Sequence, residues 1–450
     1  METLERLKLG QLIGQRRLKL SGGLAAFPLE ILNMADSLEV LDLSGNCFSS
    51  LPEAFSQLKR LKILFLNNNR FKEFPAVLAE CPALSMISFK HNQIEVIGDR
   101  ALSPTVRWLI LTDNRLKGLP STIGKLSKLQ KLMLAGNQLQ SLPDEMANCH
   151  SLELIRLSVN QLQALPAWLF SLPRLAWLAY AGNPCCQGSP LAARSIPTIN
   201  EDELQIGEVL GQGASGVIYK GLWAPADSDR REVAVKLFKG EITSDGLPVD
   251  EMRACVAAGS HPSLVTVLGK LSDRVTAQVQ GKAGLIFSCI PSDYTNLGNP
   301  PDLDTCTRDT YREGTSFELP MILRILRGIA SAIAHLHGHG ILHGDLYAHN
   351  ILINDAGESF LGDFGAASFY RPSAAIARPL ERLEVRAFGC LIEDLLNRCV
   401  PTDGDASAAA TVASLRDLQR ACMHSMPTER PLFAAISEYL TSPPISKSLI

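Results

Sequence analysis

The sequence predicts two structural parts of different class, an α/β solenoid of short repeats and then a separate α+β domain. The chain has 450 residues, enough for two or three domains that each have their own core. An asparagine recurs at a nearly fixed interval through the first half. In the second half this period gives way to a glycine-rich turn between β-rich stretches and to a long helical stripe over residues 321–337.

The repeats are defined by a frame of leucines that ends in asparagine and then Leu-Pro. Residues 38–52 form the first full copy of Leu-x-x-Leu-x-Leu-x-x-Asn, residues 129–143 form another, and residues 17–24 form a degenerate copy with Gly23 in the Asn position. About eight units therefore span residues 15–190. The recurring asparagines are separated by 23, 23, 22, 23, 23 and 23 residues: Asn46, Asn69, Asn92, Asn114, Asn137, Asn160 and Asn183.

This frame resembles the leucine-rich repeat. In each unit the Leu-x-Leu segment predicts one short strand with inward-pointing alternate side chains, so that stacked units form a parallel sheet. Each Asn is expected to bond to the backbone of neighbouring turns. Its loss would leave buried groups unpaired, at about 1–3 kcal/mol each. These residues are scaffold.

A protein partner is expected on the concave face of the repeats, where the outward-pointing strand residues gather. Trp108 and Trp177 are candidate anchors because large aromatic residues dominate protein interfaces. The face is apolar and weakly basic: Asp42, Phe65, Ser88, Ile110, Met133, Arg156 and Ala179, with neighbours Lys62, Arg107 and Lys131.

The repeat frame stops at Asn183, where turn-forming residues follow. We expect a leucine-rich-repeat domain over residues 1–190, a linker over 191–202, a second domain over 203–442 and a tail over 443–450.

The second half contains four chemically suggestive pieces in order. Gly211-x-Gly213-x-x-Gly216 lies between two β-rich runs, whereas the glycines of dinucleotide-binding folds precede a helix. Residues 233–236 read Val-Ala-Val-Lys. Asp345, with an Asn five residues later, can orient an attacking hydroxyl, while Asn350 and Asp363 carry oxygen atoms suited to Mg²⁺.

Taken together, these pieces resemble the protein-kinase signature set. The resemblance implies a two-lobed protein-kinase fold, ATP and Mg²⁺ as cofactors, Asp345 as the catalytic base, and Asn350 and Asp363 as metal ligands. Glu251 is the expected partner of Lys236, ahead of Asp250 and Glu241, and residues 284–290 are the expected hinge strand. The implied ATP-binding residues are Leu210, Gly211, Gln212, Gly213, Ala214, Ser215, Gly216, Val217, Ile218, Lys236 and Glu251.

Three departures from the family pattern bear on function. Gly344 stands where many protein kinases have Arg, which suggests activity that does not wait for a phosphorylated activation loop. Tyr347 replaces the Lys common in serine/threonine kinases. The segment after Asp363 is short. Glu384 resembles the residue with which the family's next helix starts. Arg430 resembles an Arg that the family carries near the end of the domain. Residues 379–381 are the nearest fragment of the motif that normally pairs with that Arg.

The leading hypothesis is an ATP- and Mg²⁺-dependent serine/threonine protein kinase whose repeats bind a protein partner or substrate. A small-molecule kinase is an alternative, because His-Gly-Asp with an Asn five residues after the Asp also resembles aminoglycoside- and choline-kinase-like enzymes. A pseudokinase scaffold is another, although Lys236, Asp345, Asn350 and Asp363 are all present. Ser368 and Ser373 are candidate autophosphorylation sites.

Charge and cysteine content bound the location and the partners. The net charge of −3 gives no footprint for nucleic acid or for an anionic membrane, so neither is expected as a partner. The first residues lack an apolar signal core, and no long uncharged apolar run predicts a membrane span. Eleven scattered cysteines without zinc-like pairs are typical of free thiols in a reducing cytoplasm.

Overall fold

The computed structural model describes residues 2–186, 196–213, 215–225, 229–240, 242–272, 283–401 and 405–442. The chain divides into two compact units, Met1–Leu175 with Asn183–Cys185, and Ala176–Gly182 with Cys186–Ile450. This division differs from the expected border at residue 190, because Ala176–Gly182 groups with the second unit. Ala214, Glu241, residues 191–195 of the linker and the tail over 443–450 lie outside the described residues.

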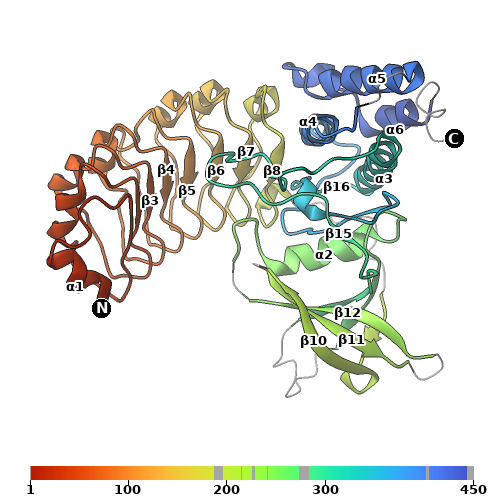
Figure 1. Cartoon of the computed structure of the whole chain (residues 1–450), viewed down its shortest axis with the longest axis horizontal. Coiled ribbons are helices and arrows are strands. Elements are labelled where there is room, and N and C mark those ends of the chain that lie inside the picture. Colours follow the sequence, from red (N-terminus) through yellow and green to blue (C-terminus); the bar gives the residue numbers. More distant parts are fainter. Residues whose placement is uncertain are drawn as a thin grey trace. The chain divides into compact units, whose positions relative to one another are not determined.

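The first unit is the expected solenoid of leucine-rich repeats (Figure 1). Each strand pairs in parallel with the next, and a Leu or Ile in the middle of the strand is aligned with its equivalent in the neighbour, as in Leu41↔Leu64. After helix α1 (Glu2–Lys8) the strands are β1 (Arg17–Lys19), β2 (Val40–Asp42), β3 (Ile63–Phe65), β4 (Met86–Ser88), β5 (Trp108–Ile110), β6 (Lys131–Met133) and β7 (Leu154–Arg156).

Short 3₁₀ helices form the opposite side of the repeats from the strands (Figure 1). Six of them each follow a proline in extended conformation, whose fixed φ suits the start of a helical turn. They are η1 (Leu29–Met34), η2 (Glu53–Gln57), η3 (Ala76–Glu80), η4 (Ser121–Lys125), η5 (Asp144–Asn148) and η6 (Ala167–Ser171).

The repeating asparagines hold adjacent turns together, as predicted. Asn137 accepts a hydrogen bond from the backbone N–H of Leu116 at 3.0 Å. Its amide nitrogen donates to the carbonyls of Leu111 at 2.9 Å and Leu134 at 3.0 Å. The same three contacts recur at Asn160, so that each Asn satisfies backbone groups of two turns.

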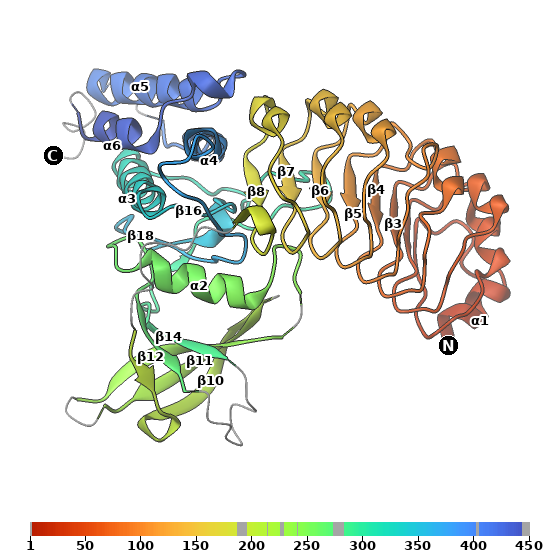
Figure 2. The ribbon, with the colours of Figure 1, turned by 180° about the vertical axis from the view of Figure 1, so that it is seen from behind.

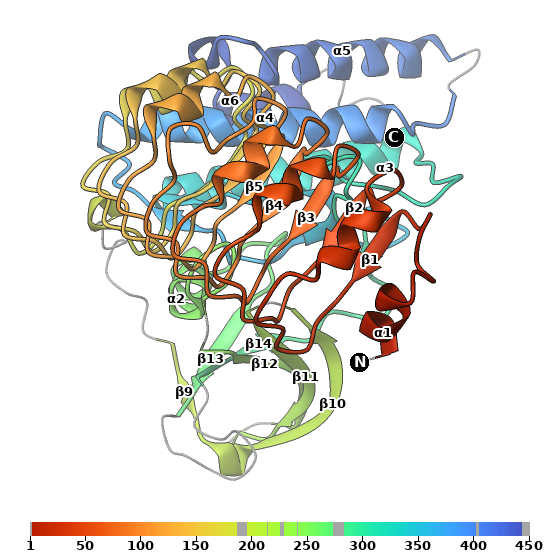
Figure 3. The same cartoon turned by 90° about the vertical axis from the view of Figure 1, so that its left-hand side faces the viewer.

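The second unit begins with a six-stranded sheet in the order β10-β11-β12-β14-β13-β9, which is curved in Figure 3. Its core contains Val233, Val235 and Ile286, all fully buried. The strands and the helices beside them are β9 (Thr198–Ile199), η8 (Glu201–Glu203), β10 (Leu204–Gln212), β11 (Gly216–Trp223), β12 (Arg231–Phe238), α2 (Pro248–Ala258), β13 (Val267–Leu271) and β14 (Gly284–Ser288). Figure 2 shows α2 between this sheet and the helical part of the same unit.

The remainder of the second unit is mainly helical, which completes the expected two-lobed α+β arrangement. Its long helices are α3 (Leu319–Gly338), α4 (Ala377–Leu396), α5 (Ala406–Cys422) and α6 (Phe433–Thr441), with 3₁₀ turns η7 (Pro184–Cys186, at the border of the two units), η9 (Ala348–Asn350) and η10 (Pro427–Glu429). The small strands are β8 (Trp177–Ala179), β15 (Thr295–Asn296), β16 (Ile341–Leu342), β17 (Ile351–Ile353), β18 (Ser359–Leu361) and β19 (Ser368–Phe369).

Helix α3 confirms the stripe expected over residues 321–337. Ile322, Ile329 and Leu336, spaced by seven residues on this stripe, are fully buried. Among the described residues, α3 is one helix long and apolar enough to cross a membrane by length and composition alone. More than half of it is buried in the second unit, as is usual for the central helix of a domain core.

Candidate active site

A cavity of about 490 Å³ lies between the six-stranded sheet and the helical part of the second unit. It brings together the predicted Lys236, Glu251, Asn350 and Asp363. Its remaining wall is mostly apolar: Leu210, Ile218, Ala234, Cys255, Ala258, Leu264, Val265, Phe287, Ser288, Cys289, Ile290, Asn296, His349, Leu352, Leu361, Gly362 and Phe364. An apolar slot with a few convergent polar groups fits a ligand that has a flat base and a charged end.

Lys236 enters this cavity from the middle of β12, where it pairs with Ile218 of β11 and Leu285 of β14. Its ammonium group donates to the carboxylate of Glu251 on α2, the partner expected from the sequence. Burial lowers the pKa of Lys236, but the charges of Glu251 and Asp363 outweigh it and raise this pKa above its usual value. Lys236 therefore remains a fixed positive charge in the cavity.

The glycine turn connects β10 to β11 and leaves space for a ligand. An added Cβ at Gly211 or Gly213 would meet no atom within 4 Å, whereas one at Gly216 would lie 2.6 Å from the carbonyl oxygen of Leu237. Gly216 is therefore required by packing against the neighbouring strand. Leu210 and Ile218 line the cavity, and Gln212, Ser215 and Val217 lie on the same strands and turn.

The expected hinge segment, residues 284–290, consists of β14 and the two residues after it. Phe287, Ser288, Cys289 and Ile290 of this segment all line the cavity. Phe287 also pairs with Ala234 of β12, which lies two residues before Lys236 in the same strand. The expected hinge segment and the predicted Lys236 therefore lie on neighbouring strands of one sheet.

Asp345 and Asn350 are held against each other in the loop after β16. The amide nitrogen of Asn350 donates to the Asp345 carboxylate at 2.8 Å and to the Asp345 carbonyl at 2.9 Å. This contact directs the amide oxygen of Asn350 away from Asp345. His343 donates from Nε2 to the Gly362 carbonyl at 2.9 Å, which ties the loop to the strand that leads into Asp363.

Asp363 is placed opposite Asn350 by the expected hairpin, in which β17 and β18 pair antiparallel. The backbone N–H of Gly362 donates to the Asn350 carbonyl at 2.9 Å. Asp363 has a φ of +52°, a left-handed conformation that Asp adopts more readily than most residues. Its Oδ1 accepts the backbone N–H of Gly365 at 3.1 Å.

The donor set near Asp363 fits Mg²⁺. This ion prefers oxygen ligands, and it is usually held by one or two carboxylates together with phosphate oxygens and water. Asn350 and Asp363 supply an amide oxygen and a carboxylate in the same cavity as Lys236. Within the described ranges no group of three His, Cys, Asp or Glu side chains could hold a metal, so a complete protein cage is not formed there.

Glu384 binds the backbone of the loop just before Asp345. It is almost fully buried in α4 and accepts from the backbone N–H groups of Gly344 at 2.7 Å and His343 at 3.3 Å. The Nε2 of His337 donates to the same carboxylate at 2.7 Å. Burial acts to raise the pKa of Glu384, but these donors hold the pKa below its ordinary value.

Asp309 is a supporting residue that the sequence did not reveal. It accepts the backbone N–H of Ala348 at 2.5 Å and pairs with Nδ1 of His349 at 2.6 Å, so it anchors the residues just before Asn350. Asp309 lies about 40 residues before that loop, and no periodic pattern in the sequence relates the two. Only the fold brings these elements together.

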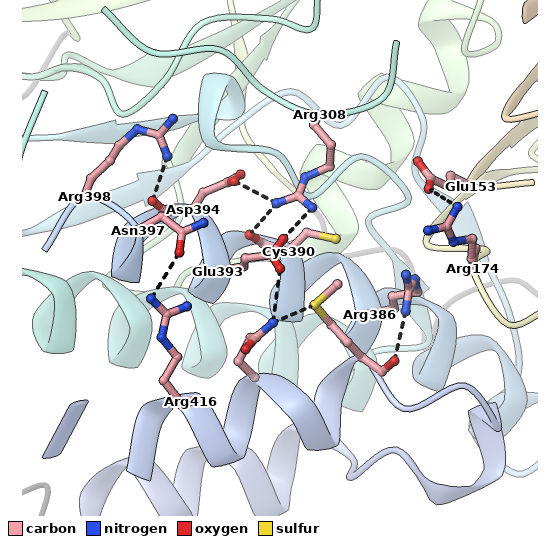
Figure 4. A network of polar contacts seen from close by, with 12 residues as sticks. Glu153, Arg174, Arg308, Arg386, Cys390, Glu393, Asp394, Asn397, Arg398 and Arg416 are labelled. Atoms are coloured by element: carbon pink, nitrogen blue, oxygen red, sulfur yellow. Dashed lines mark hydrogen bonds and ion pairs between the residues drawn. The ribbon is translucent and has the colours of Figure 1, made fainter. Parts of the chain in front are cut away.

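The neighbouring Arg308 joins the segment that carries Asp309 to α4 (Figure 4). It donates to Glu393 at 2.7 Å, to Asp394 at 2.7 Å and to the carbonyl of Cys390 at 3.2 Å. Burial lowers the pKa of Arg308, and the surrounding acidic groups more than reverse this, so that its pKa is raised. Asp309 is therefore held in place by a neighbour that is itself fixed by two carboxylates.

Three expectations need correction. Glu384 does not mark a helix start: α4 already begins at Ala377, and Glu384 lies within it. Ser368 is fully buried and accepts a hydrogen bond from the backbone of Tyr180, so it is not an accessible phosphorylation site. Trp177 is only 2% exposed and stacks on Tyr347 within the second unit, so it is no anchor for a partner.

Arg430 and Glu381, of the fragment 379–381, each bond to groups other than one another. Arg430 is buried and donates to the carbonyls of His424 at 3.0 Å and Arg382 at 3.1 Å. Burial lowers its pKa to about 9. Glu381, in the fragment expected to pair with it, accepts from the hydroxyl of Tyr370 at 2.9 Å. Ser373, the other candidate phosphorylation site, is exposed.

Comparison with known families agrees with both halves. Residues 204–386 match the protein tyrosine and serine/threonine kinase family. Residues 104–162 and 127–184 match the leucine rich repeat, and residues 36–80 match leucine rich repeats in two copies. The chain carries leucine-rich repeats followed by a protein kinase domain.

Individual relatives of this kinase domain differ in the acceptor that their names state. R826 of Acanthamoeba polyphaga mimivirus, named as a serine/threonine-protein kinase/receptor, is 28% identical over 52% of this chain and 15% of its own length. The dual specificity protein kinase pyk3 of Dictyostelium discoideum is 25% identical over 54% of this chain and 19% of its own. The tyrosine-protein kinase receptor torso of Bombyx mori is 25% identical over 54% and 38% respectively.

Proposed function

We propose that this chain is a serine/threonine protein kinase that transfers the γ-phosphoryl group of ATP with the help of Mg²⁺. The observation that carries the proposal is the single cavity that gathers Lys236, Glu251, Asn350 and Asp363 beside Asp345. Lys236 and the three polar residues Asp345, Asn350 and Asp363 lie close enough to act on one ligand. Phosphoryl transfer is the reaction that uses them together.

The roles follow from position and charge. Lys236, kept charged by Glu251, binds the phosphates, and the open backbone at Gly211 and Gly213 lets them approach closely. Asn350 and Asp363 would hold Mg²⁺, which supplies neutralisation of phosphate charge when it is bound. Asp345 accepts or orients the proton of the acceptor hydroxyl. Catalysis on this scheme rests on positioning and electrostatics.

The acceptor is proposed from the relatives, and the partner is proposed from the surface of the repeats. Relatives named as serine/threonine kinases favour a serine or threonine hydroxyl, whereas torso and pyk3 make tyrosine the competing outcome. For the repeats we propose a protein partner on their concave face, where Trp108 and Lys131 form a cation–π pair at 4.3 Å. The eleven free cysteines support a reducing, cytoplasmic location.

The test is transfer of label from ATP in the presence of Mg²⁺, with and without a generic protein substrate. Asp345→Asn should abolish labelling but retain ATP binding. Asp355→Asn, a matched loss of one exposed carboxylate on the β17–β18 turn, should not change labelling. Phosphoamino-acid analysis then separates serine and threonine from tyrosine.

Two results would contradict the proposal. ATP binding without labelling of any protein would favour a pseudokinase scaffold. ATP consumption that depends on small hydroxyl compounds would favour a small-molecule kinase, an outcome for which the short segment between Asp363 and α4 provides room.

A further inference from the structure

A seven-residue stretch at the end of the repeat frame is built into the kinase unit. Ala176–Gly182 groups with the second unit, although its sequence continues the leucine-rich pattern up to Asn183. Strand β8 of this stretch is buried throughout, and Tyr180 is only 3% exposed. We call residues 176–182 the docking stretch. Such complete burial implies close contact with its neighbours.

The first contact of the docking stretch is with the loop that carries Asp345. The indole of Trp177 stacks on the ring of Tyr347, with centroids 4.3 Å apart and planes 7° apart. Its Nε1 also donates to the carbonyl of Leu346 at 3.0 Å. Leu346 and Tyr347 directly follow Asp345, so Trp177 fixes both the backbone and a side chain beside the proposed base.

The second contact explains the unusual Gly344. An added Cβ at this position would lie 2.5 Å from the carbonyl oxygen of Leu178 and 2.8 Å from that of Ala366. Gly344 also has a φ of +75°, a conformation that favours glycine. Two backbones therefore occupy the space that a side chain would need, and one of them belongs to the docking stretch.

The third contact reaches the segment after Asp363. The backbone N–H of Tyr180 donates to Oγ of Ser368 at 2.9 Å, and its hydroxyl donates to the carbonyl of Phe369 at 3.1 Å. Ser368 and Phe369 form β19, which pairs with β16 immediately before His343. The docking stretch thus contacts both the loop that carries Asp345 and the segment that follows Asp363.

We propose that Trp177, Leu178 and Tyr180 are positioning residues that hold these two segments in their working arrangement without a phosphate. In phosphate-controlled kinases, an added phosphate orders the corresponding segment by pairing with arginine. Here the carbonyl of Leu178 lies over Gly344, and Tyr180 holds Ser368 and Phe369 through hydrogen bonds. The inference rests on the proposed phosphotransfer for its catalytic readout.

A double-mutant cycle on the whole chain tests the first contact. Trp177→Ala and Tyr347→Ala should each lower kcat about tenfold or more while KM for ATP stays the same, because misplacement of a reacting group costs rate and leaves nucleotide binding intact. The double variant should lose no more than the worse single variant, since both remove one contact. Losses that multiply, or an unchanged kcat, would overturn the proposal.

Two variants separate positioning from general loss of folding. Tyr180→Phe keeps the ring and removes only the hydroxyl that donates to Phe369, so it should lower kcat without lowering the melting temperature by more than a few degrees. Trp168→Ala, which removes a half-buried indole in η6 of the first unit, should leave kcat unchanged. Full activity in Tyr180→Phe together with Trp177→Ala would contradict the inference.

Activity without phosphate is the remaining requirement. Protein that mass spectrometry shows to be free of phosphate should have the same initial rate as protein preincubated with ATP. A lag that disappears on phosphorylation of the segment after Asp363 would overturn the inference.

Amide hydrogen exchange distinguishes failure of this inference from failure of the proposed function. Trp177→Ala should accelerate exchange at residues 343–350 and 366–370 but not in β12 or α3. If the wild-type chain transfers no phosphate, the proposed function fails, and this exchange pattern alone decides whether the docking stretch orders the loop. Unchanged exchange in those residues would overturn the positioning role in either case.

Discussion

The indole of Trp177 lies parallel to the ring of Tyr347, 7° from coplanar and 4.3 Å away. Tyr347 is two residues from Asp345, and Trp177 comes from the last strand of the repeat frame. Stacked aromatic pairs contribute about 0.5–1.5 kcal/mol beyond their buried area. A residue assigned by sequence to the recognition surface is thus part of the scaffold of the catalytic loop.

Substitution of Gly344 should damage the kinase unit. Gly344→Ala places a Cβ against the carbonyls of Leu178 and Ala366 in a left-handed backbone, which alone costs about 1–3 kcal/mol. Gly344→Arg should be worse, although Arg is common at this position in protein kinases. Thermal unfolding and kcat measure both effects. Gly338→Ala, whose Cβ meets no atom within 4 Å, is the control and should be neutral or slightly stabilising.

Replacement of Lys236 should affect chemistry more than folding. Lys236→Met removes the positive charge that Glu251 and Asp363 hold in the cavity, and it should lower the rate of phosphoryl transfer by about 10²-fold or more. Single-turnover kinetics at saturating ATP measure this loss. Lys220→Met on the adjacent strand removes an exposed ammonium paired with Glu232 and should change the rate little. Equal rates for the two variants would rule out the assigned role of Lys236.

Glu384 should make the kinase unit sensitive to acid. Its pKa is lowered in the folded chain, so its stabilising contribution is complete above its unfolded pKa of about 4.3 and is lost as the pH falls through the lower folded pKa. Urea unfolding should therefore show the free energy of unfolding decreasing over that acid window. Glu384→Gln should remove this pH dependence and cost about 3–5 kcal/mol at neutral pH.

The matched control for Glu384 is Glu438→Gln, which neutralises an exposed carboxylate on α6. It should leave both the neutral-pH stability and the acid dependence as they are in the wild type. A Glu384→Gln chain that retained the wild-type acid dependence would show that another carboxylate is responsible.

Loss of a repeat asparagine should weaken the solenoid and spare catalysis. Asn137→Ala would leave the N–H of Leu116 and the carbonyls of Leu111 and Leu134 without this partner, at about 1–3 kcal/mol for each group that stays unsatisfied. Exchange in β5 to β7 should rise, as measured by mass spectrometry. Gln138→Ala changes the exposed neighbour and should have no such effect. A large fall in kcat with Asn137→Ala would contradict this separation.

The sequence predicted those parts of the molecule that depend on local spacing. The asparagine period identified the solenoid. Of the predicted site residues, Lys236, Asn350 and Asp363 line one cavity, and Asp345 is bonded to Asn350. Each of these patterns is short, and the chemistry needs those residue types. The expected pairing of Lys236 with Glu251 is also present.

Long-range packing was beyond the sequence. Arg308 meets Glu393 across 85 residues, and Trp177 meets Leu346 across 169, so no periodicity relates them. One signal was available: aromatic Trp177 begins the last repeat strand, at a position that is half-exposed in β2 and β3. A buried aromatic residue at such a position indicates a neighbour that the repeats themselves do not provide.

The docking stretch also changes how the two halves can be inherited. Domains joined by a plain linker can be exchanged between genes, because each folds without the other. A kinase domain that began at residue 190 would lack Trp177, Leu178 and Tyr180. Its Gly344 would no longer pack against the carbonyl of Leu178. Recombination at residue 190 would thus separate the kinase unit from residues 176–182, which belong to it.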